Sequence, residues 1–285
     1  MPPDTPTPSP DGPPFGWQGG GMRTGSGSAP TFNGTYLATH HGVVVVTCNY
    51  RLNVFGFLSS ESMRDRSIDR SIGNYGIQDQ RAVLEWVQAN IANFGGDPAR
   101  VTIFGESAGG ASVLHHLVRP DKSRGLFAHA VMESAPLPDG YMAQPVEIAE
   151  KTFAHVLDAT GCKDIACLES RSTDELQNAT VAVASYAPTI DGVELSMMPW
   201  RVLQAGGAVS VPTMLGSNRD EGATHLAKDT NYRATDDASL RAWAADTFGA
   251  DLAPKIAALY PSTSYNETSC WCASSPLLYP LGSLI

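Results

Sequence analysis

Val101-Thr-Ile-Phe-Gly-Glu-Ser-Ala-Gly-Gly110 carries the strongest structural signal in the chain. Its apolar beginning, Val101 to Phe104, predicts a short strand, and the residues from Ala108 to Val118 predict a helix. Between them, Gly105-Glu-Ser-Ala-Gly109 fits the pattern G-x-S-x-G. In a strand–turn–helix context this pattern presents a serine on a strained bend, where the neighbours two positions away must lack side chains. The stretch therefore predicts that Ser107 is a catalytic nucleophile, the alternative being an incidental serine in a glycine-rich turn.

Apolar runs and amphipathic stretches alternate on both sides of this motif. The β-branched run from Val43 to Thr47 predicts a central strand, and Asp79 to Ile91 predicts an amphipathic helix. Further strands are predicted at Ala130 to Met132 and Val211 to Leu215, with a helical stretch around Glu147 to Leu157 between them. This alternation predicts an α/β fold with a mostly parallel central sheet flanked by helices.

Length and charge restrict the classes of partner. The chain has 285 residues, of which 42% are hydrophobic and 17% charged, enough to bury a large core. Its 19 Lys+Arg and 29 Asp+Glu give a formal net charge of −10 at pH 7. Because no basic cluster offsets this charge, we expect no nucleic-acid partner. The longest aliphatic run, Val43 to Val46, is far shorter than the roughly 20 residues of a membrane span, so none is expected.

Cysteines and short motifs give further limits. The spacing of the five cysteines matches no zinc ribbon or finger, and no HExxH or comparable cluster occurs, so we expect no metal site. Cysteine usage alone does not define the redox compartment. Three Asn-x-Ser/Thr sequons, at Asn33, Asn178 and Asn266, favour a secretory route.

A serine nucleophile also needs a base, an acid that orients the base, and N–H donors for the developing oxyanion. Gly19-Gly-Gly21 precedes the Val43 strand, and a triple glycine can turn backbone N–H groups toward a ligand. The N–H group of Ala108 would be their partner donor. A lone triplet is also compatible with a flexible linker. It is neither a P-loop nor a dinucleotide fingerprint, because the Gly-Lys-Ser/Thr and G-x-G-x-x-G spacings are absent from it.

Seven blocks spread over roughly residues 15 to 225 occur in the order of one known family. They are Trp17-Gln-Gly-Gly-Gly21, Val44-Val-Val-Thr-Cys-Asn-Tyr-Arg-Leu52 with Phe55-Gly-Phe-Leu58, Gly73-Asn-Tyr-Gly-Ile-Gln-Asp-Gln80, Asn93-Phe-Gly-Gly-Asp-Pro98, Val101 to Gly110, Pro188-Thr-Ile-Asp-Gly192 and Gly216-Ser-Asn-Arg-Asp-Glu-Gly222. The chain resembles the type B carboxylesterases, the cholinesterase-like branch of the α/β-hydrolases. This resemblance implies an α/β-hydrolase fold and hydrolysis of a small-molecule carboxylic ester through an acyl-enzyme, without a cofactor.

Carried over by position, the resemblance makes Ser107 the nucleophile. The backbone N–H groups of Gly20, Gly21 and Ala108 would form the oxyanion hole. Glu221 becomes the acid of the triad, and it follows a predicted strand, where α/β sheets place catalytic groups. Without the resemblance, Glu221 would be interpreted as a solvated carboxylate of a loop.

The resemblance also implies four supporting features. Glu106 resembles the buried second carboxylate of the family, and Ser134 resembles its supporting hydroxyl. Arg51 and Asp79 occupy the positions of a structural ion pair, the alternative being two ordinary surface charges. The loop Cys162–Cys167 matches a disulfide loop of the family, although it is unusually short.

The catalytic histidine is the main departure from the family. In the family it follows the acid by roughly a hundred residues, in a His-Gly block near the end of the sheet, and no such block follows Glu221 here. His225 has the right order but lies only four residues beyond the acid, where it would share a local segment with it. The other histidines lie in helix-like stretches, before a strand or outside any motif: His40, His41, His115, His116, His129 and His155.

We therefore expect a truncated α/β-hydrolase domain that lacks its N-terminal strands and its C-terminal third. Residues 1–14 are predicted to be a Pro-rich lead-in, residues 15–261 the partial carboxylesterase domain, and residues 262–285 an irregular tail. Missing strands would expose sheet edges, which favours aggregation. The alternatives to an esterase are an inactive fragment or a cholinesterase-like binding or adhesion module without catalysis, against which the intact elbow argues.

Overall fold

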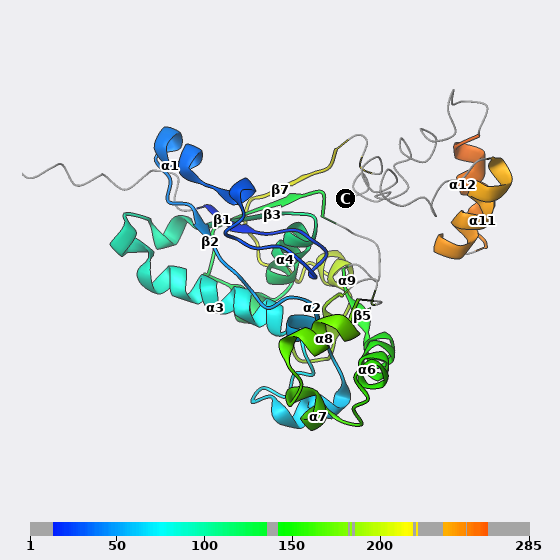
Figure 1. Ribbon diagram of the computed structural model, residues 1–285. Coiled ribbons are helices and arrows are strands. Elements are labelled where there is room, and N and C mark those ends of the chain that lie inside the picture. The colour runs from blue at the N-terminus through cyan, green and yellow to red at the C-terminus, as the bar shows by residue number, and fades with distance from the viewer. Residues whose placement is uncertain are drawn as a thin grey trace, which may run out of the picture. The chain divides into compact units, whose positions relative to one another are not determined.

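The computed structural model describes residues 14–135, 142–181, 183, 186–218, 221, 236–248 and 250–261. The chain divides into two compact units, Met1–Leu215 and Gly216–Ile285. Figure 1 shows a sheet with helices packed around it in the first of these. The predicted lead-in, apart from Pro14, and the predicted tail at 262–285 lie outside the described residues.

The main sheet has five strands in the order β2-β1-β3-β4-β7. Their bounds are β1 Pro14–Trp17, β2 Val46–Thr47, β3 Thr102–Glu106, β4 His129–Glu133 and β7 Thr213–Gly216. β1 runs parallel to β2 and β3, with Trp17 beside Gly105. β3 also runs parallel to β4, with Glu106 beside Glu133. The carboxyl ends of β1, β3 and β4 therefore meet at one edge of the sheet, where α/β proteins place their sites.

One predicted strand occupies a different position from the one expected. The run from Val43 to Thr47, predicted as a central strand, contributes only β2, and this strand lies at the end of the described strand order. Among the described strands only β1 pairs with it, so Val46 is half-buried instead of covered on both sides. The central position next to β3 belongs to β1, which the sequence pattern did not predict.

Helices connect the strands of the first unit. Their bounds are α1 Thr35–His41, α2 Asn53–Phe57, α3 Tyr75–Asn90, α4 Ala108–Leu117, α5 Pro120–Ser123, α6 Val146–Thr160, α7 Ile165–Glu169, α8 Thr173–Ala179 and α9 Pro199–Gln204, with 3-10 turns η1 Pro30–Phe32, η2 Glu61–Arg66, η3 Ile91–Phe94 and η4 Pro98–Arg100. The helices predicted from periodicity correspond to α3, α4 and α6. A small parallel sheet joins β5 Gln144–Pro145 to β6 Thr189–Ile190.

The second unit contains two described helices, α11 Asp237–Phe248 and α12 Ala253–Leu259. They pack through small apolar clusters that include Leu240, Ala244 and Ile256. In neither unit is any helix among the described residues both long and apolar enough to cross a lipid bilayer.

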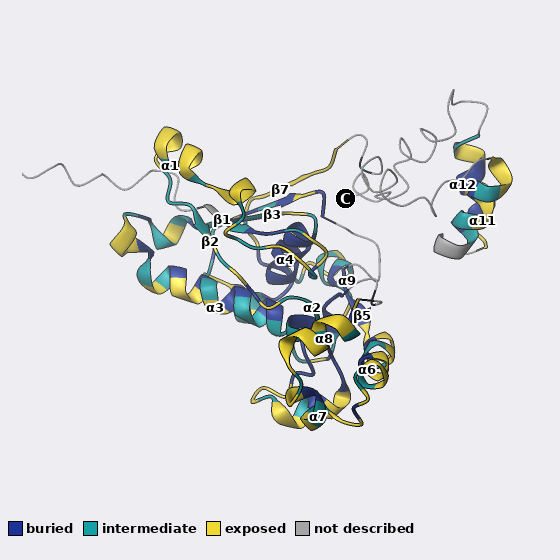
Figure 2. Ribbon diagram, in the orientation of Figure 1, coloured by how far each residue is buried: buried dark blue, intermediate teal, exposed yellow. Residues whose placement is uncertain are grey.

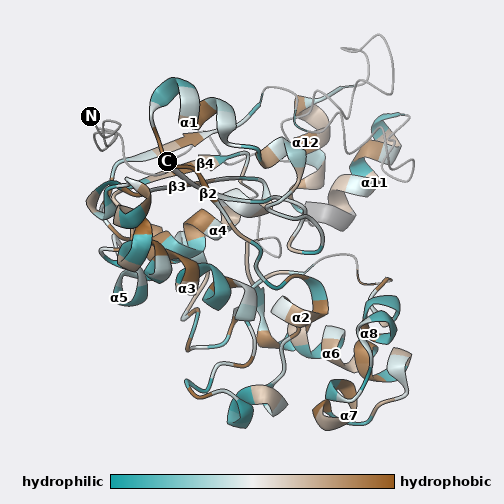
Figure 3. Cartoon of the chain, turned by 60° about the vertical axis from the view of Figure 1, so that its left-hand side comes forward, coloured by the Kyte–Doolittle hydropathy of each residue, from teal (hydrophilic) through white to brown (hydrophobic). Residues whose placement is uncertain are grey.

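Helix α4 forms the centre of the first unit. All ten of its residues are buried, because the helix contacts β1, β3 and β4. Figure 2 shows α4 in dark blue, whereas α1 is yellow and contains no buried residue. Along α3, by contrast, hydrophilic and hydrophobic residues alternate, as Figure 3 shows. Buried Leu84 and Val87 place the apolar side of α3 in the same core as Leu114 of α4.

Two histidines of α4 belong to this core. His115 and His116 are completely buried. The ring of His116 stacks on Trp17 with 5.3 Å between centroids, and its Nε2 lies 3.1 Å from Oε1 of Gln80. Because burial removes the hydration of an imidazolium, it lowers the pKa of His115 to about 4 and that of His116 well below its usual value. Both side chains therefore act as neutral core residues.

A carboxylate with no exposed surface, Glu194, is surrounded by three cations. Arg81 pairs with Oε1 of Glu194 through Nη2, and its Nη1 lies 3.3 Å from Oε2. Lys122 Nζ lies 2.9 Å from Oε2, and Arg119 Nη1 lies 3.8 Å from Oε1. Since a buried charge is tolerated only when it is paired, this cluster joins three separate segments of the unit.

The disulfide and the ion pair implied by the resemblance are both confirmed. Cys162 and Cys167 are bonded through their sulfur atoms, immediately before and within α7. Arg51 donates from Nη2 to Asp79 Oδ1 at 2.7 Å and from Nε to Oδ2 at 2.8 Å. The guanidinium also lies over the ring of Tyr75, 5.1 Å from its centroid.

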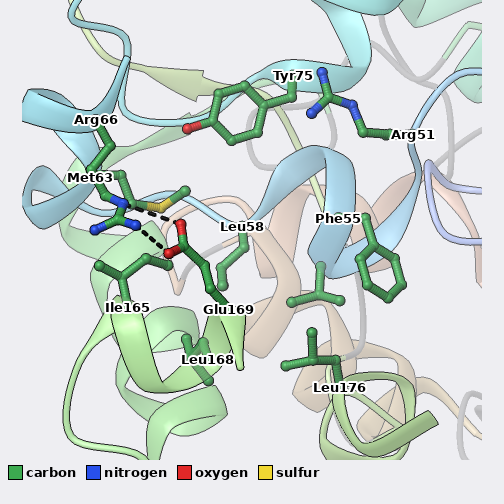
Figure 4. A pocket seen from close by; sticks show the side chains of 11 residues that line it. Arg51, Phe55, Leu58, Met63, Arg66, Tyr75, Ile165, Leu168, Glu169 and Leu176 are labelled. Carbon is green, nitrogen blue, oxygen red and sulfur yellow. Dashed lines mark hydrogen bonds and ion pairs between the residues drawn. The ribbon is translucent and has the colours of Figure 1, made fainter. Parts of the chain in front are cut away.

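Arg51 and Tyr75 line a pocket of about 630 Å³ that lies between η2, α2 and the helices α7 and α8. Figure 4 shows its apolar side chains, among them Leu58 and Leu168, with Arg66 and Glu169 paired beside them. None of the predicted catalytic residues lines this pocket.

Glu194→Ala is expected to destabilise the first unit strongly, since it leaves buried Arg81 without a counter-charge. The free energy of unfolding should fall by about 3–5 kcal/mol. Glu169→Ala, which removes the exposed partner of Arg66, should cost less than about 1 kcal/mol. Urea unfolding of the two variants measures both changes in the free energy of unfolding. Equal losses of stability in the two variants would contradict the burial of Glu194.

Acid should destabilise the fold before its carboxylates titrate. The pKa of His115 is about 4 in the folded chain, below the ordinary value of 6.5. Between these values the unfolded chain binds a proton that the folded chain excludes, so the free energy of unfolding falls as pH falls, by about 3 kcal/mol from this residue. Urea unfolding from pH 7.5 to pH 4 measures the slope. His115→Leu should flatten it, and an identical slope in this variant would contradict the burial of His115.

Candidate active site

β3 and α4 meet at Ser107 in a sharp turn. The serine has φ 56° and ψ −121°, a backbone region in which a non-glycine residue costs about 1–3 kcal/mol. Its N–H group donates to the carbonyl of Glu133 at the end of β4, at 2.9 Å. Its own carbonyl accepts the N–H group of Ala111 at 3.0 Å, within the first turn of α4. The strand–turn–helix context predicted for the G-x-S-x-G motif is confirmed.

The glycines of the motif are required because the helix lies very close to two strands. A Cβ atom on Gly105 would lie 2.4 Å from the carbonyl carbon of Gly109. A Cβ atom on Gly109 would lie 2.2 Å from the carbonyl oxygen of Trp17 in β1. Both distances are far inside van der Waals contact, so any larger residue would separate α4 from the sheet.

The triple glycine reaches the same turn from β1. Because β1 is the parallel neighbour of β3, the loop after Trp17 leaves the sheet at the edge where Ser107 lies. A Cβ atom on Gly19 would lie 3.4 Å from Cβ of Ser107, so this glycine packs directly against the elbow. Gly20 and Gly21 have φ values of 103° and 63°, which favour glycine. The structure thus brings the predicted loop to the nucleophile, and the donor role of its N–H groups stays a prediction.

Tyr50 holds the start of this glycine loop through a hydrogen bond to its backbone. Its hydroxyl donates to the carbonyl oxygen of Gln18 at 3.1 Å, and both residues are buried. Burial raises the pKa of Tyr50, so the hydroxyl stays protonated and remains a donor. On the elbow side, Ala108 is the first residue of α4, and its N–H group has no acceptor within the helix. A helix N-terminus with such free donors suits a developing negative charge.

The two supporting side chains differ from each other. Glu106, which the resemblance implies to be buried, has an exposed side chain. It is the last residue of β3, and its neighbour Gly19 contributes no side chain to cover it. Ser134 follows β4 with a φ of 47° and is 6% exposed. The burial expected of Glu106 is therefore wrong for this structure, and the supporting roles of both residues stay predictions.

Glu221 belongs to the second unit, after β7. Its Oε1 accepts the backbone N–H group of Asn218 at 2.6 Å, which holds the carboxylate in a tight turn. Because Ser107 and Glu221 fall in different compact units, their partnership in a triad stays a prediction.

Six of the seven histidines lie among the described residues, and none of these six hydrogen-bonds Ser107 there. Two are exposed on α1, two are buried in α4, one is on α6 and one begins β4. They are His40, His41, His115, His116, His155 and His129. His129 pairs with Thr102, at the end of β3 remote from Glu106, about 13 Å from it by strand rise. His225 lies outside the described residues.

Two parts of this arrangement, strand β1 and Tyr50, do not follow from the sequence pattern. β1 was not predicted as a strand because Pro14 and Gly16 are residue types depleted in strands. Tyr50 lies in a block that the resemblance includes, but no role followed from its type. The one available signal is a tyrosine three residues beyond a predicted strand.

Gly109→Ala is expected to lower the free energy of unfolding by about 1–3 kcal/mol, because the new methyl group collides with the backbone of β1. Gly216→Ala is the matched control, since nothing lies within 4 Å of its Cβ position, and it should change stability by less than about 0.5 kcal/mol. Urea unfolding followed by tryptophan fluorescence measures both. A Gly109→Ala variant as stable as the control would contradict the close approach.

The chain is similar in sequence to proteins of one known family. Residues 17–264 match the family model described as the carboxylesterase family. Cholinesterase from Mus musculus is 37% identical over 222 residues, which are 73% of this chain and 36% of that protein. Para-nitrobenzyl esterase from Bacillus subtilis (strain 168) is 36% identical over 268 residues, 90% of this chain and 53% of that protein. The chain thus spans about half the length of these relatives or less.

Solved structures agree with the fold. The carboxylesterase EST55 from Geobacillus stearothermophilus at pH 6.2 superposes with a TM-score of 0.80 and 33% identity, over 94% of this chain and 56% of that chain. A structure of PNB esterase gives a TM-score of 0.76 and 34% identity, over 91% and 56% of the two chains. The extent of the family match, together with these neighbours, places the chain in the carboxylesterase family, with its α/β-hydrolase fold.

Proposed function

We propose that this chain carries the nucleophile and the oxyanion-binding groups of a carboxylic ester hydrolase. The observation that supports this most is the strained turn at Ser107, packed against a glycine loop at the carboxyl edge of parallel strands. A backbone held away from its preferred angles, with free N–H groups beside it, is what acyl transfer needs.

In the proposed reaction, Oγ of Ser107 attacks the ester carbonyl carbon while a base accepts its proton. The backbone N–H groups of Gly20, Gly21 and Ala108 donate to the oxyanion that forms. The C–O bond to the alcohol then breaks, and the alcohol leaves with the proton from the base. Water repeats the sequence on the acyl-enzyme, releasing the carboxylic acid and restoring the serine.

The acid and base of the triad complete the proposal. Glu221 is assigned to orient the base, as the family order of serine, acid and histidine requires. The base is assigned to a histidine that is not among the seven of this sequence. The six described histidines lie in the core or on other surfaces, and His225 follows Glu221 by only four residues. Without that histidine, only the residual rate of the oxyanion hole and binding is expected.

The names of the relatives support the substrate class. They include a para-nitrobenzyl esterase and a cocaine esterase from Oryctolagus cuniculus, which is 41% identical over 209 residues. A small-molecule carboxylic ester is therefore the proposed substrate, with no cofactor required by the chemistry.

The assignment of Ser107 as nucleophile is tested with the protein encoded by the longest open reading frame that contains this chain. The measurement is the rate at which this protein hydrolyses p-nitrophenyl acetate. Ser107→Ala should lower kcat by about 10⁴-fold or more, because the covalent step is lost. Ser28→Ala, at an exposed turn, should leave the rate unchanged. Turnover retained in Ser107→Ala would overturn the assignment. If a fluorophosphonate probe fails to label Ser107 in this folded protein, the result would favour the non-catalytic binding module instead.

A further inference from the structure

One sequon lies on a fully accessible part of the fold. Asn33-Gly-Thr35 joins η1 to α1, and neither of these elements contains a buried residue. The side chains of Asn33 and Thr35 are both exposed. A bulky, solvated group attached at Asn33 would therefore displace no packed side chain.

The local hydrogen bonds leave the amide nitrogen available. The Thr35 hydroxyl donates to Oδ1 of Asn33 at 2.6 Å, and the Thr35 N–H group donates to the same oxygen at 2.9 Å. Both bonds engage the amide oxygen, and among the described hydrogen bonds Nδ2 of Asn33 donates to none. The sequon is thus folded into a turn that places its asparagine and its threonine side by side at the surface.

The second described sequon, Asn178-Ala-Thr180, is arranged differently. Asn178 lies within α8, and Thr180 is 1% exposed. The Thr180 hydroxyl donates to the carbonyl oxygen of Gln177 at 2.9 Å, inside the end of the helix. An enzyme that must reach both members of a sequon can do so at Asn33 in the folded chain, whereas at Asn178 it requires unfolding of α8.

Two further observations are consistent with a glycan attached at Asn33, next to α1. The disulfide between Cys162 and Cys167 indicates folding in an oxidising compartment, where glycan transfer also takes place. Large side chains beside the sequon are exposed, with Tyr36 at 65% and Leu37 at 39%. A glycan at Asn33 would shield these apolar groups from contact with other chains.

We propose that Asn33 is an N-glycosylation site that is used in the folded chain. Nδ2 of Asn33 attacks the anomeric carbon of an oligosaccharide carried on a polyprenyl diphosphate. The new N–C bond forms as the C–O bond to the diphosphate breaks, and Nδ2 loses one proton to a base of the transferase. The lipid diphosphate is the leaving group, so no oxidant or reductant is consumed. This proposal is independent of the esterase reaction.

The test uses the chain produced without glycans and checked for folding by near-ultraviolet circular dichroism. The folded chain is incubated with a purified oligosaccharyltransferase and a lipid-linked oligosaccharide, and the products are mapped by peptide mass spectrometry. One glycan at Asn33 is expected on the folded chain, and an additional one at Asn178 after unfolding in urea and dilution into the assay. An unmodified Asn33 on the folded chain would overturn the proposal, as would equal modification of Asn178 there.

Matched variants separate the sequon from the fold. Asn33→Gln and Thr35→Ala should each abolish transfer to the folded chain, while Thr35→Ser should retain it. Asn178→Gln should leave the yield at Asn33 unchanged. Because Asn33, Thr35 and Asn178 are all exposed, the four variants at these three positions are expected to fold. A glycan yield that Asn33→Gln does not reduce would overturn the proposal.

Discussion

The close approach of α4 to β1 and β3 is the constraint on which the rest of the structure depends. Gly105 and Gly109 allow backbone to touch backbone where a methyl group would overlap the neighbouring chain. Once the helix lies that close to the sheet, the chain between them has room only for a single turn residue with positive φ, and that residue is Ser107. The strain at the serine is therefore a consequence of the packing of α4, which the surrounding burial of all ten helix residues maintains.

The same packing brings the glycine loop to the elbow at Ser107. Because β1 lies beside β3 in parallel, the glycine loop and the elbow emerge at one edge of the sheet without any long-range adjustment. Tyr50 fixes the loop at its base, and Trp17 links β1 to α4 by stacking on His116. The elbow and the start of the glycine loop are thus held by packed strands and by helix α4. The glycan acceptor at Asn33 lies on the exposed α1 segment, which contributes no buried residue to this framework.

Much of this could be predicted from the sequence where a local pattern has a single physical meaning. The periodicity of α3 and α6 and the elbow motif are of this kind, and the family resemblance added the Arg51 to Asp79 pair and the disulfide. The rest depends on contacts between distant segments. Nothing local shows that Pro-Phe-Gly-Trp forms a strand, that β2 lies at the end of the described strands, or that Glu106 is exposed. Glu194 and its partners Arg81 and Lys122 lie far apart in the chain, so no single window of sequence shows that they meet.

The candidate site depends on Ser107 lying on a strained turn that packs against the glycine loop. An X-ray structure of the chain at a resolution that defines backbone torsions tests it most directly. We expect a positive φ at Ser107, near 56°, with Gly19 in contact with the serine Cβ. A Ser107 in the ordinary helical region, or a glycine loop displaced from β3, would contradict it.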